Sequence, residues 1–105
     1  MNLIDFKSTL SQATPPAGLS APLQALWLDG KEDWHASHDA LQGQADGNGA
    51  AWVHAYLHRK EGDPANAHYW YRRANKPESS ATLAEEWDAI AAALLADADC
   101  TAVAQ

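Results

Sequence analysis

Apolar residues recur along this chain at the three- and four-residue spacing of amphipathic helices, and Gly or Pro interrupts that spacing between stretches. Leu3, Phe6 and Leu10 mark one such stripe, and Leu83 and Trp87 belong to another. The pattern predicts an all-α fold of about six helices, with two stacked, repeat-like helical hairpins flanked by a helix at each end. The predicted elements are an N-terminal helix over 1–13, a first hairpin over 21–42, a second hairpin over 50–76 and a C-terminal helix over 82–96.

Start and stop signals set the ends of these elements. Ser20 before Pro22 is typical of a helix N-cap, and the segment from Thr82 to Glu85 fits a capping box. The glycine-rich segment 43–49 predicts a surface loop, and the residues from Asp97 onward are expected to fray. Abundant Ala and scarce Val and Ile agree with helices and exclude a β-sandwich or a doubly wound sheet.

Tryptophan is expected to form much of a thin, Ala-rich core. Trp27, Trp34, Trp70 and Trp87 each fall on the inward stripe of a different predicted helix, so they should fill the seams between helices of small residues. Trp52 lies on a helix that is apolar on nearly all sides. Such a helix is usually central, and we expect it to lie in the middle of the fold.

The two hairpins resemble each other in sequence. Gly30 and Gly62, like Trp34 and Ala67, lie about 33 residues apart, which is the period of stacked helical repeats. The segment 62–77 resembles the second half of a tetratricopeptide or Sel1-like repeat, in which two small residues and an aromatic one let the helices approach closely. The positions that fit are Ala67, Tyr71 and Ala74. This resemblance implies stacked hairpins with the first and last helices as caps.

A longer stretch carries a second resemblance. The segments 52–63, 66–67 and 69–74 are similar to a family of short, uncharacterised bacterial proteins, as are the upstream stretch 23–27 and the spacing of Trp34, His38 and Gln42. The similarity covers the range 23–74. It implies a bacterial source and a helical fold, and it brings no activity, substrate or cofactor with it.

Composition and charge exclude several classes of function. The 105 residues fit a single domain over 1–105. Seven Lys and Arg stand against fourteen Asp and Glu, and the net charge of −7 opposes binding to DNA, RNA or an acidic membrane. The single Cys excludes a disulfide framework and a Cys-rich zinc site, and no apolar run is long enough to span a bilayer. These features predict a cytoplasmic protein.

Histidines are the first group of candidate site residues. His54 and His58 lie one helical turn apart, Glu61 follows within the next turn, and His38 could approach from the preceding hairpin. These residue types can hold zinc or another first-row divalent metal. The sequence favours the simpler interpretation that His54 and His58 are half-buried packing residues that donate a ring N–H to a nearby acceptor. For His38 it favours a core histidine beside Trp34.

A basic, aromatic segment is the second candidate. Five of the seven Lys and Arg lie between 59 and 76, whereas the segment 78–99 is acidic and has none. If Ala67 and Tyr71 face inward, the residues beside them face outward, where Arg and aromatic rings can bind a phosphate, a carboxylate or a base. The candidate residues are Arg59, His68, Tyr69, Arg72 and Arg73. The simpler interpretation, which we favour, pairs these basic helices with the acidic last helix of the same chain or of a second copy.

These observations favour a non-enzymatic helical module, without a cofactor, that binds a protein or peptide partner or a second copy of itself through the Arg and aromatic surface. One alternative is a metal-storage protein or metal-dependent hydrolase that uses the histidines. Another is a small-anion binder for phosphate or a nucleotide. Adjacent carboxylates such as Glu85 and Glu86 are interpreted as solvated surface, and Cys100 is too far from any His to act as a nucleophile with one.

Overall fold

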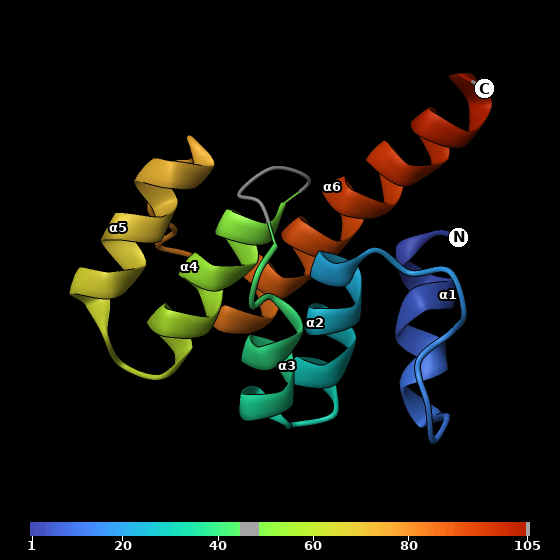
Figure 1. The fold of residues 1–105 in the computed structure, drawn as a ribbon, viewed down its shortest axis with the longest axis horizontal. Helices are drawn as coiled ribbons and strands as arrows, with labels where there is room; N and C mark the ends of the chain where they lie inside the picture. Colours follow the sequence, from blue (N-terminus) through green and yellow to red (C-terminus); the bar gives the residue numbers. More distant parts are fainter. Residues whose placement is uncertain (45–48, 105) are drawn as a thin grey trace.

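The computed structural model describes residues 1–44 and 49–104, with side chains described as far as residue 98. The predicted loop over 43–49 therefore falls partly outside the described residues, at 45–48. Within the described part the chain is all-α, as predicted, with six α-helices and one short 3-10 helix (Figure 1). The elements are α1 (Leu3–Ser8), η1 (Thr9–Ser11), α2 (Ala21–Gly30), α3 (Trp34–Ala40), α4 (Ala50–Lys60), α5 (Pro64–Ala74) and α6 (Leu83–Ala104).

The helices are arranged around α4. Helices α2, α4 and α6 contact one another, while α3 packs on α2 and α4, α5 packs on α4, and α1 packs on α6. Figure 1 shows α5 and α1 at opposite ends of the molecule, with α4, α2 and α3 between them. The predicted pair of hairpins and the central position of α4 are confirmed. None of the described helices is both long enough and apolar enough to cross a membrane.

The N-terminal helix is shorter than the predicted 1–13. Helix α1 ends at Ser8, and η1 tightens the chain over the next three residues. The hydroxyl of Ser8 donates to the carbonyl of Asp5 (2.7 Å), and that of Thr9 donates to the carbonyl of Phe6 (2.6 Å). Such side chains compete with the helical hydrogen-bond ladder, so the α-helix ends before the Pro pair at 15–16.

The C-terminal helix is longer than the predicted 82–96. Its start is as predicted, because Glu85 accepts from the amide and hydroxyl of Thr82 while the Thr82 hydroxyl accepts from the amide of Glu85. The helix then continues to Ala104. The residues after Asp97 contain no Gly or Pro to end it, and Ala favours helix throughout this region. The expectation of fraying from Asp97 stays a prediction.

The turns that join the helices of each hairpin have the same geometry. Asp33 caps α3 and Asp63 caps α5, and their backbone angles agree within two degrees: φ −115° and ψ 79° at Asp33, φ −113° and ψ 78° at Asp63. The preceding residues, Glu32 and Gly62, both have positive φ, at 62° and 87°. Equivalent positions therefore lie thirty residues apart. The sequence interpretation that paired Gly30 with Gly62 was out of register, and the repeat-family resemblance stays a prediction.

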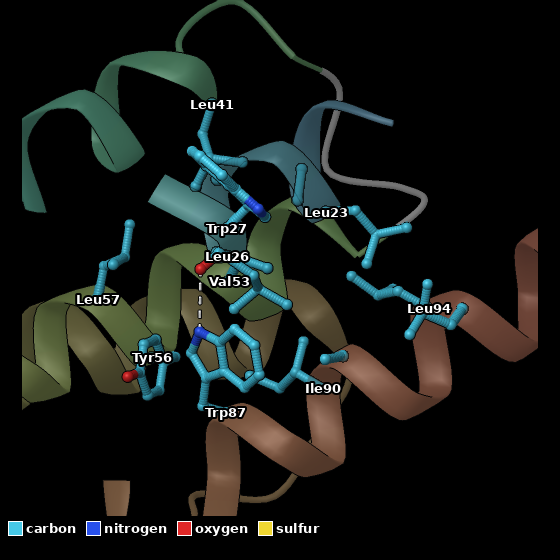
Figure 2. Close-up of a cluster of buried hydrophobic side chains, with 14 of the residues drawn as sticks. Leu23, Leu26, Trp27, Leu41, Val53, Tyr56, Leu57, Trp87, Ile90 and Leu94 are labelled. Atoms are coloured by element: carbon cyan, nitrogen blue, oxygen red, sulfur yellow. Dashed lines mark hydrogen bonds between the residues drawn. The ribbon is translucent and has the colours of Figure 1, made fainter. Parts of the chain in front are cut away.

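The main core fills the space among α2, α4 and α6 (Figure 2). Trp87 of α6 stacks on Phe6 of α1, with 5.7 Å between ring centroids, and donates its indole N–H to the carbonyl of Leu26 in α2 (3.0 Å). This hydrogen bond is the dashed line in Figure 2. The buried residues of the main core are Phe6, Leu23, Ala25, Leu26, Trp27, Leu41, Ala50, Val53, Tyr56, Leu57, Trp87, Ile90, Ala91, Leu94 and Leu95.

Other indole rings also join neighbouring elements. Trp27 donates to the Thr9 hydroxyl (3.1 Å), and Trp34 donates to the carbonyl of Leu57 in α4 (2.8 Å). Trp70 packs on a smaller cluster between α4 and α5. The predicted position of these tryptophans between helices is confirmed. At Trp27 and Trp34 the indole N–H also donates a hydrogen bond to the neighbouring element, because a buried indole N–H needs an acceptor.

Two carboxylates are buried in the fold. Asp29, near the end of α2, is 2% exposed, and it accepts from the Tyr56 hydroxyl (2.8 Å) and from Lys60 Nζ (2.9 Å). Both donors come from α4. This pair of contacts fixes the end of α2 against α4, and each carboxylate oxygen is satisfied.

Glu86 is the second buried carboxylate, and its interpretation as solvated surface was wrong. It is 4% exposed, and it accepts from Arg59 Nη1 (2.8 Å) and from the Tyr71 hydroxyl. Arg59 also donates to the carbonyl of Ala81. Arg59 thus pairs with the acidic last helix of the same chain, as the simpler interpretation of the basic segment expected, whereas Lys60 pairs with Asp29 of α2. A buried charge needs such partners to be tolerated.

Candidate metal centre

Three histidines from two helices converge beside α4. His54 and His58 are one turn apart on α4, and His38 approaches from α3, with its ring centroid 5.2 Å from that of His54 and 5.4 Å from that of His58. One ring nitrogen from each histidine lies within 4.8 Å of the other two. His38 therefore joins the two histidines of α4, as the metal alternative allowed.

The placement of His38 follows from the way α3 is fixed. The Asp33 side chain caps α3 by accepting from the amide of Ala36 (3.1 Å), and the buried hydroxyl of Ser37 donates to the carbonyl of Ala25 in α2 (2.6 Å). The hydrogen bond from Trp34 to α4 holds the other side of the helix. His38 lies one turn after Trp34, so these contacts turn it toward α4.

Two indole rings form the walls of the histidine cluster. Trp34 stacks on His38 with 5.1 Å between ring centroids, and Trp70 of α5 stacks on His54 at 4.1 Å, with interplanar angles of 8° and 11°. His54 and His58 are only 7% and 8% exposed. His54 and His58 are thus largely shielded from water, whereas His38 is half-buried.

The protonation state of His38 suits ligand binding. Burial, followed by the nearby His58, lowers the pKa of His38 below the ordinary value of 6.5. The imidazole is therefore neutral at neutral pH. A neutral imidazole has a lone pair on one nitrogen, which is the form that binds a metal ion.

Polar side chains at the edge of the cluster orient two of the rings. Glu61 Oε1 lies 2.9 Å from His58 Nδ1, and the Gln42 side-chain amide lies 3.1 Å from His38 Nδ1. A carboxylate that accepts from Nδ1–H leaves the Nε2 lone pair of the same ring for a metal, and this arrangement is common behind metal-bound histidines. Glu61 therefore acts on His58 and supports the cluster from outside.

A second group, formed by His58, Glu61 and Asp63, also lies within ligand distance of one another. Its carboxylates already have other partners. Asp63 caps α5, where it accepts from the amide and the side chain of Asn66 (3.2 and 3.3 Å). Glu61 is bound to His58. We therefore assign these carboxylates to the helix start and to ring orientation, and the three-histidine group is the better metal site.

The structure separates the residues predicted for the partner surface. His68, Tyr69, Arg72 and Arg73 lie together on the exposed side of α5. Arg59 does not join them, because it lies on α4 and binds Glu86 of α6.

The sequence placed Trp34 beside His38 as a packing residue, and it did not assign Trp34, Gln42 or Trp70 a role in a metal site. The first two lie one turn on either side of His38, and this regular spacing is a signal that places all three on one face of a helix. No such signal marks Trp70, because its position against His54 depends on how α5 folds back on α4.

Comparisons with known proteins do not add to this geometry. No family model matches the chain, and neither the search of curated proteins nor that of solved structures found a match. Function is therefore inferred from the site itself.

Proposed function

We propose that the protein binds a first-row divalent metal ion, zinc in particular, through His38, His54 and His58. The observation that carries this proposal is the approach of one ring nitrogen from each histidine to within 4.8 Å of the other two. Three imidazole nitrogens this close together can donate their lone pairs to a single cation.

The distances are close to those of a coordinated ion. A tetrahedral zinc centre with bonds of about 2.0–2.1 Å to nitrogen holds its nitrogens roughly 3.3 Å apart. The three rings have to close in by at most about 1.5 Å from their present separation, which small side-chain rotations provide. Stacking on Trp34 and Trp70 keeps the rings of His38 and His54 parallel to the indoles, so these two imidazoles rotate within their present planes.

The donor set selects the type of metal. Imidazole nitrogen suits zinc, copper and nickel, whereas magnesium and calcium prefer oxygen ligands. The carboxylate of Glu61 is used to orient His58, so it adds negative charge near the ion without taking a ligand position. Three protein ligands leave a fourth position of a tetrahedral ion for water or another small ligand. This pattern fits an exchangeable or reactive ion better than a closed structural site.

Metal content and thermal stability test the proposal. Protein purified without a histidine tag should take up one equivalent of zinc by elemental analysis. At a free zinc concentration one hundred times the Kd, the free energy of unfolding should rise by about 2.7 kcal/mol. Replacing His54→Gln or His38→Gln should abolish both effects. His68→Gln is the matched control, because His68 lies on the exposed side of α5 and pairs with Glu78 (3.1 Å).

Two outcomes would contradict the proposal. One is wild-type protein that holds far less than one equivalent and melts at the same temperature with and without zinc. The other is uptake by the His54→Gln and His38→Gln variants that equals uptake by His68→Gln. Circular dichroism of each variant establishes that the helices are retained.

A further inference from the structure

The outward side of α5 is chemically unlike the rest of the surface. We call its exposed side chains His68, Tyr69, Arg72 and Arg73 the α5 face. Between Asp63 and Glu78 the chain has no acidic residue, although the protein as a whole has a net charge of −7. Figure 1 shows α5 at one end of the molecule, and the four side chains of the α5 face are exposed.

The basic residues elsewhere are already used within the chain. Lys7 pairs with Asp88, Lys60 with Asp29 and Arg59 with Glu86. Lys31 donates to two backbone carbonyls, and Lys76 lies over the ring of Trp52. Among the described residues, the Arg72 side chain is the one guanidinium or ammonium group with no such contact. Its five N–H donors are left for a ligand.

Aromatic rings fix the neighbouring arginine. The Arg73 guanidinium lies over the rings of Tyr69 and Trp70, 5.4 and 5.1 Å from their centroids, and it also donates to the Tyr69 hydroxyl. Tyr69 is nevertheless 49% exposed. A shallow cavity of about 430 Å³ lies between the four side chains of the α5 face. Arginine held on an aromatic surface loses little further freedom on binding, and this favours a specific contact.

We propose that the α5 face binds an acidic segment of a protein partner. The forked guanidinium of Arg72 matches the geometry of a carboxylate, and Tyr69 offers an exposed ring for the partner's apolar atoms. Nucleic acid is the less suitable occupant, because the net charge of −7 repels a long polyanion, whereas a short acidic segment meets mainly the local positive field. This interaction is independent of the metal, since the α5 face contributes none of the three histidine ligands.

Binding of a defined probe tests this inference. A short fluorescein-labelled oligoglutamate peptide, followed by fluorescence anisotropy at low salt, should bind the wild type and be released as salt is added. Arg72→Glu should weaken its affinity by about tenfold or more, because the substitution replaces the attractive group with a repulsive one. Lys7→Glu is the matched control. It makes the same change of charge on α1, at the opposite end of the molecule, and loses only an exposed ion pair.

Each other occupant predicts a different result, and each would overturn the inference. Tighter binding of an oligothymidylate than of the peptide indicates nucleic acid, and displacement of the peptide by inorganic phosphate at fixed ionic strength indicates a small-anion site. Wild-type protein that sediments as a dimer which Arg72→Glu dissociates indicates a second copy of this chain. No peptide binding by the wild type, or equal weakening in Arg72→Glu and Lys7→Glu, contradicts an acidic partner directly. Unchanged melting of Arg72→Glu, which loses no internal contact, excludes unfolding as the cause.

Discussion

Glu32 and Gly62 occupy equivalent positions in the two hairpin turns, yet they are chemically different. Both have positive φ, a conformation that costs a residue with a Cβ roughly 1–2 kcal/mol and costs Gly almost nothing. No atom lies within 4 Å of the position that a Cβ at Gly62 would occupy, so any cost of a side chain there comes from the backbone alone. The second turn therefore has the residue that its geometry favours, and the first turn does not.

Exchanging the residue types at these turns should change stability in opposite directions. Gly62→Ala should lower the free energy of unfolding by about 1 kcal/mol, and Glu32→Gly should raise it by up to about 1 kcal/mol, as measured by urea denaturation. Glu32→Ala is the control for the distant contact with Lys60 (3.9 Å), because it removes that contact and keeps a Cβ. If Glu32→Gly were no more stable than Glu32→Ala, backbone strain at this turn would not explain the difference.

At the scale of the helices, Trp34 joins the fold to the candidate metal site. Its indole N–H donates to α4, and its ring stacks on His38. The ring therefore fixes the position of α3 and the orientation of the one metal ligand that α3 provides. Residues that orient metal ligands from outside commonly change affinity by about 10–100-fold when they are replaced.

Trp34→Phe should weaken zinc binding by about tenfold while the helical content stays the same. The Phe ring cannot donate to the Leu57 carbonyl, which still accepts from the Glu61 amide (3.1 Å), so losing the indole hydrogen bond should also cost about 0.5–1.5 kcal/mol of stability. Trp52→Phe is the matched control, because Trp52 is also a partly buried indole on the core and its ring contacts Lys76. Zinc titration calorimetry of the two variants separates the effects. Equal affinities would show that Trp34 does not orient His38.

The helices were largely predictable, because hydrophobic periodicity and capping residues are local features of the sequence. Ser20 and the Thr82–Glu85 box start α2 and α6 as expected. The ends were less predictable, since the side chains of Ser8 and Thr9 end α1 early by bonding locally to backbone carbonyls. The two hairpins were aligned in the wrong register because the sequence comparison matched Gly30 with Gly62. The equivalent residue in the first turn is Glu32, which has a positive φ like Gly62 although it is not a glycine.

Only part of the candidate site could be predicted from the sequence. His54 and His58 share a helix, so their spacing placed them together, and His38 was a candidate whose approach depended on the packing of α3. Trp70 comes from α5, and its stacking on His54 follows from the close contact of α4 and α5 around Ala55 and Ala67. Contacts between helices depend on the whole packing arrangement, which local patterns do not specify.

Across the whole molecule, two buried carboxylates tie α4 to its neighbours. Asp29 of α2 accepts from Tyr56 of α4, and Glu86 of α6 accepts from Arg59 of α4 and from Tyr71 of α5. Burial, followed by the nearby carboxylate, raises the pKa of both tyrosines above the ordinary value of 10.0. In each network the tyrosine hydroxyl donates its proton to the hydrogen bond with the carboxylate. A phenolate could not donate this hydrogen bond, and the negative carboxylate would repel it.

This arrangement predicts loss of stability in alkali. The unfolded chain releases the two phenolic protons near pH 10, while the folded chain retains them to higher pH. The unfolded state then binds fewer protons than the folded state, so the free energy of unfolding must fall as the pH rises above about 10. Urea denaturation at a series of pH values, with tyrosinate absorbance followed in parallel, measures both quantities.

Tyr71→Phe should make that fall shallower by the contribution of one proton, which is about 1.4 kcal/mol per pH unit. It should also lower stability at neutral pH, because Glu86 keeps Arg59 but loses a buried hydrogen bond. Tyr69→Phe removes the same hydroxyl from an exposed ring and is the matched control, which should keep the alkaline slope of the wild type. If Tyr71→Phe kept that slope as well, the Tyr71–Glu86 contact would not hold its proton through folding, and alkaline unfolding would have to begin at another group.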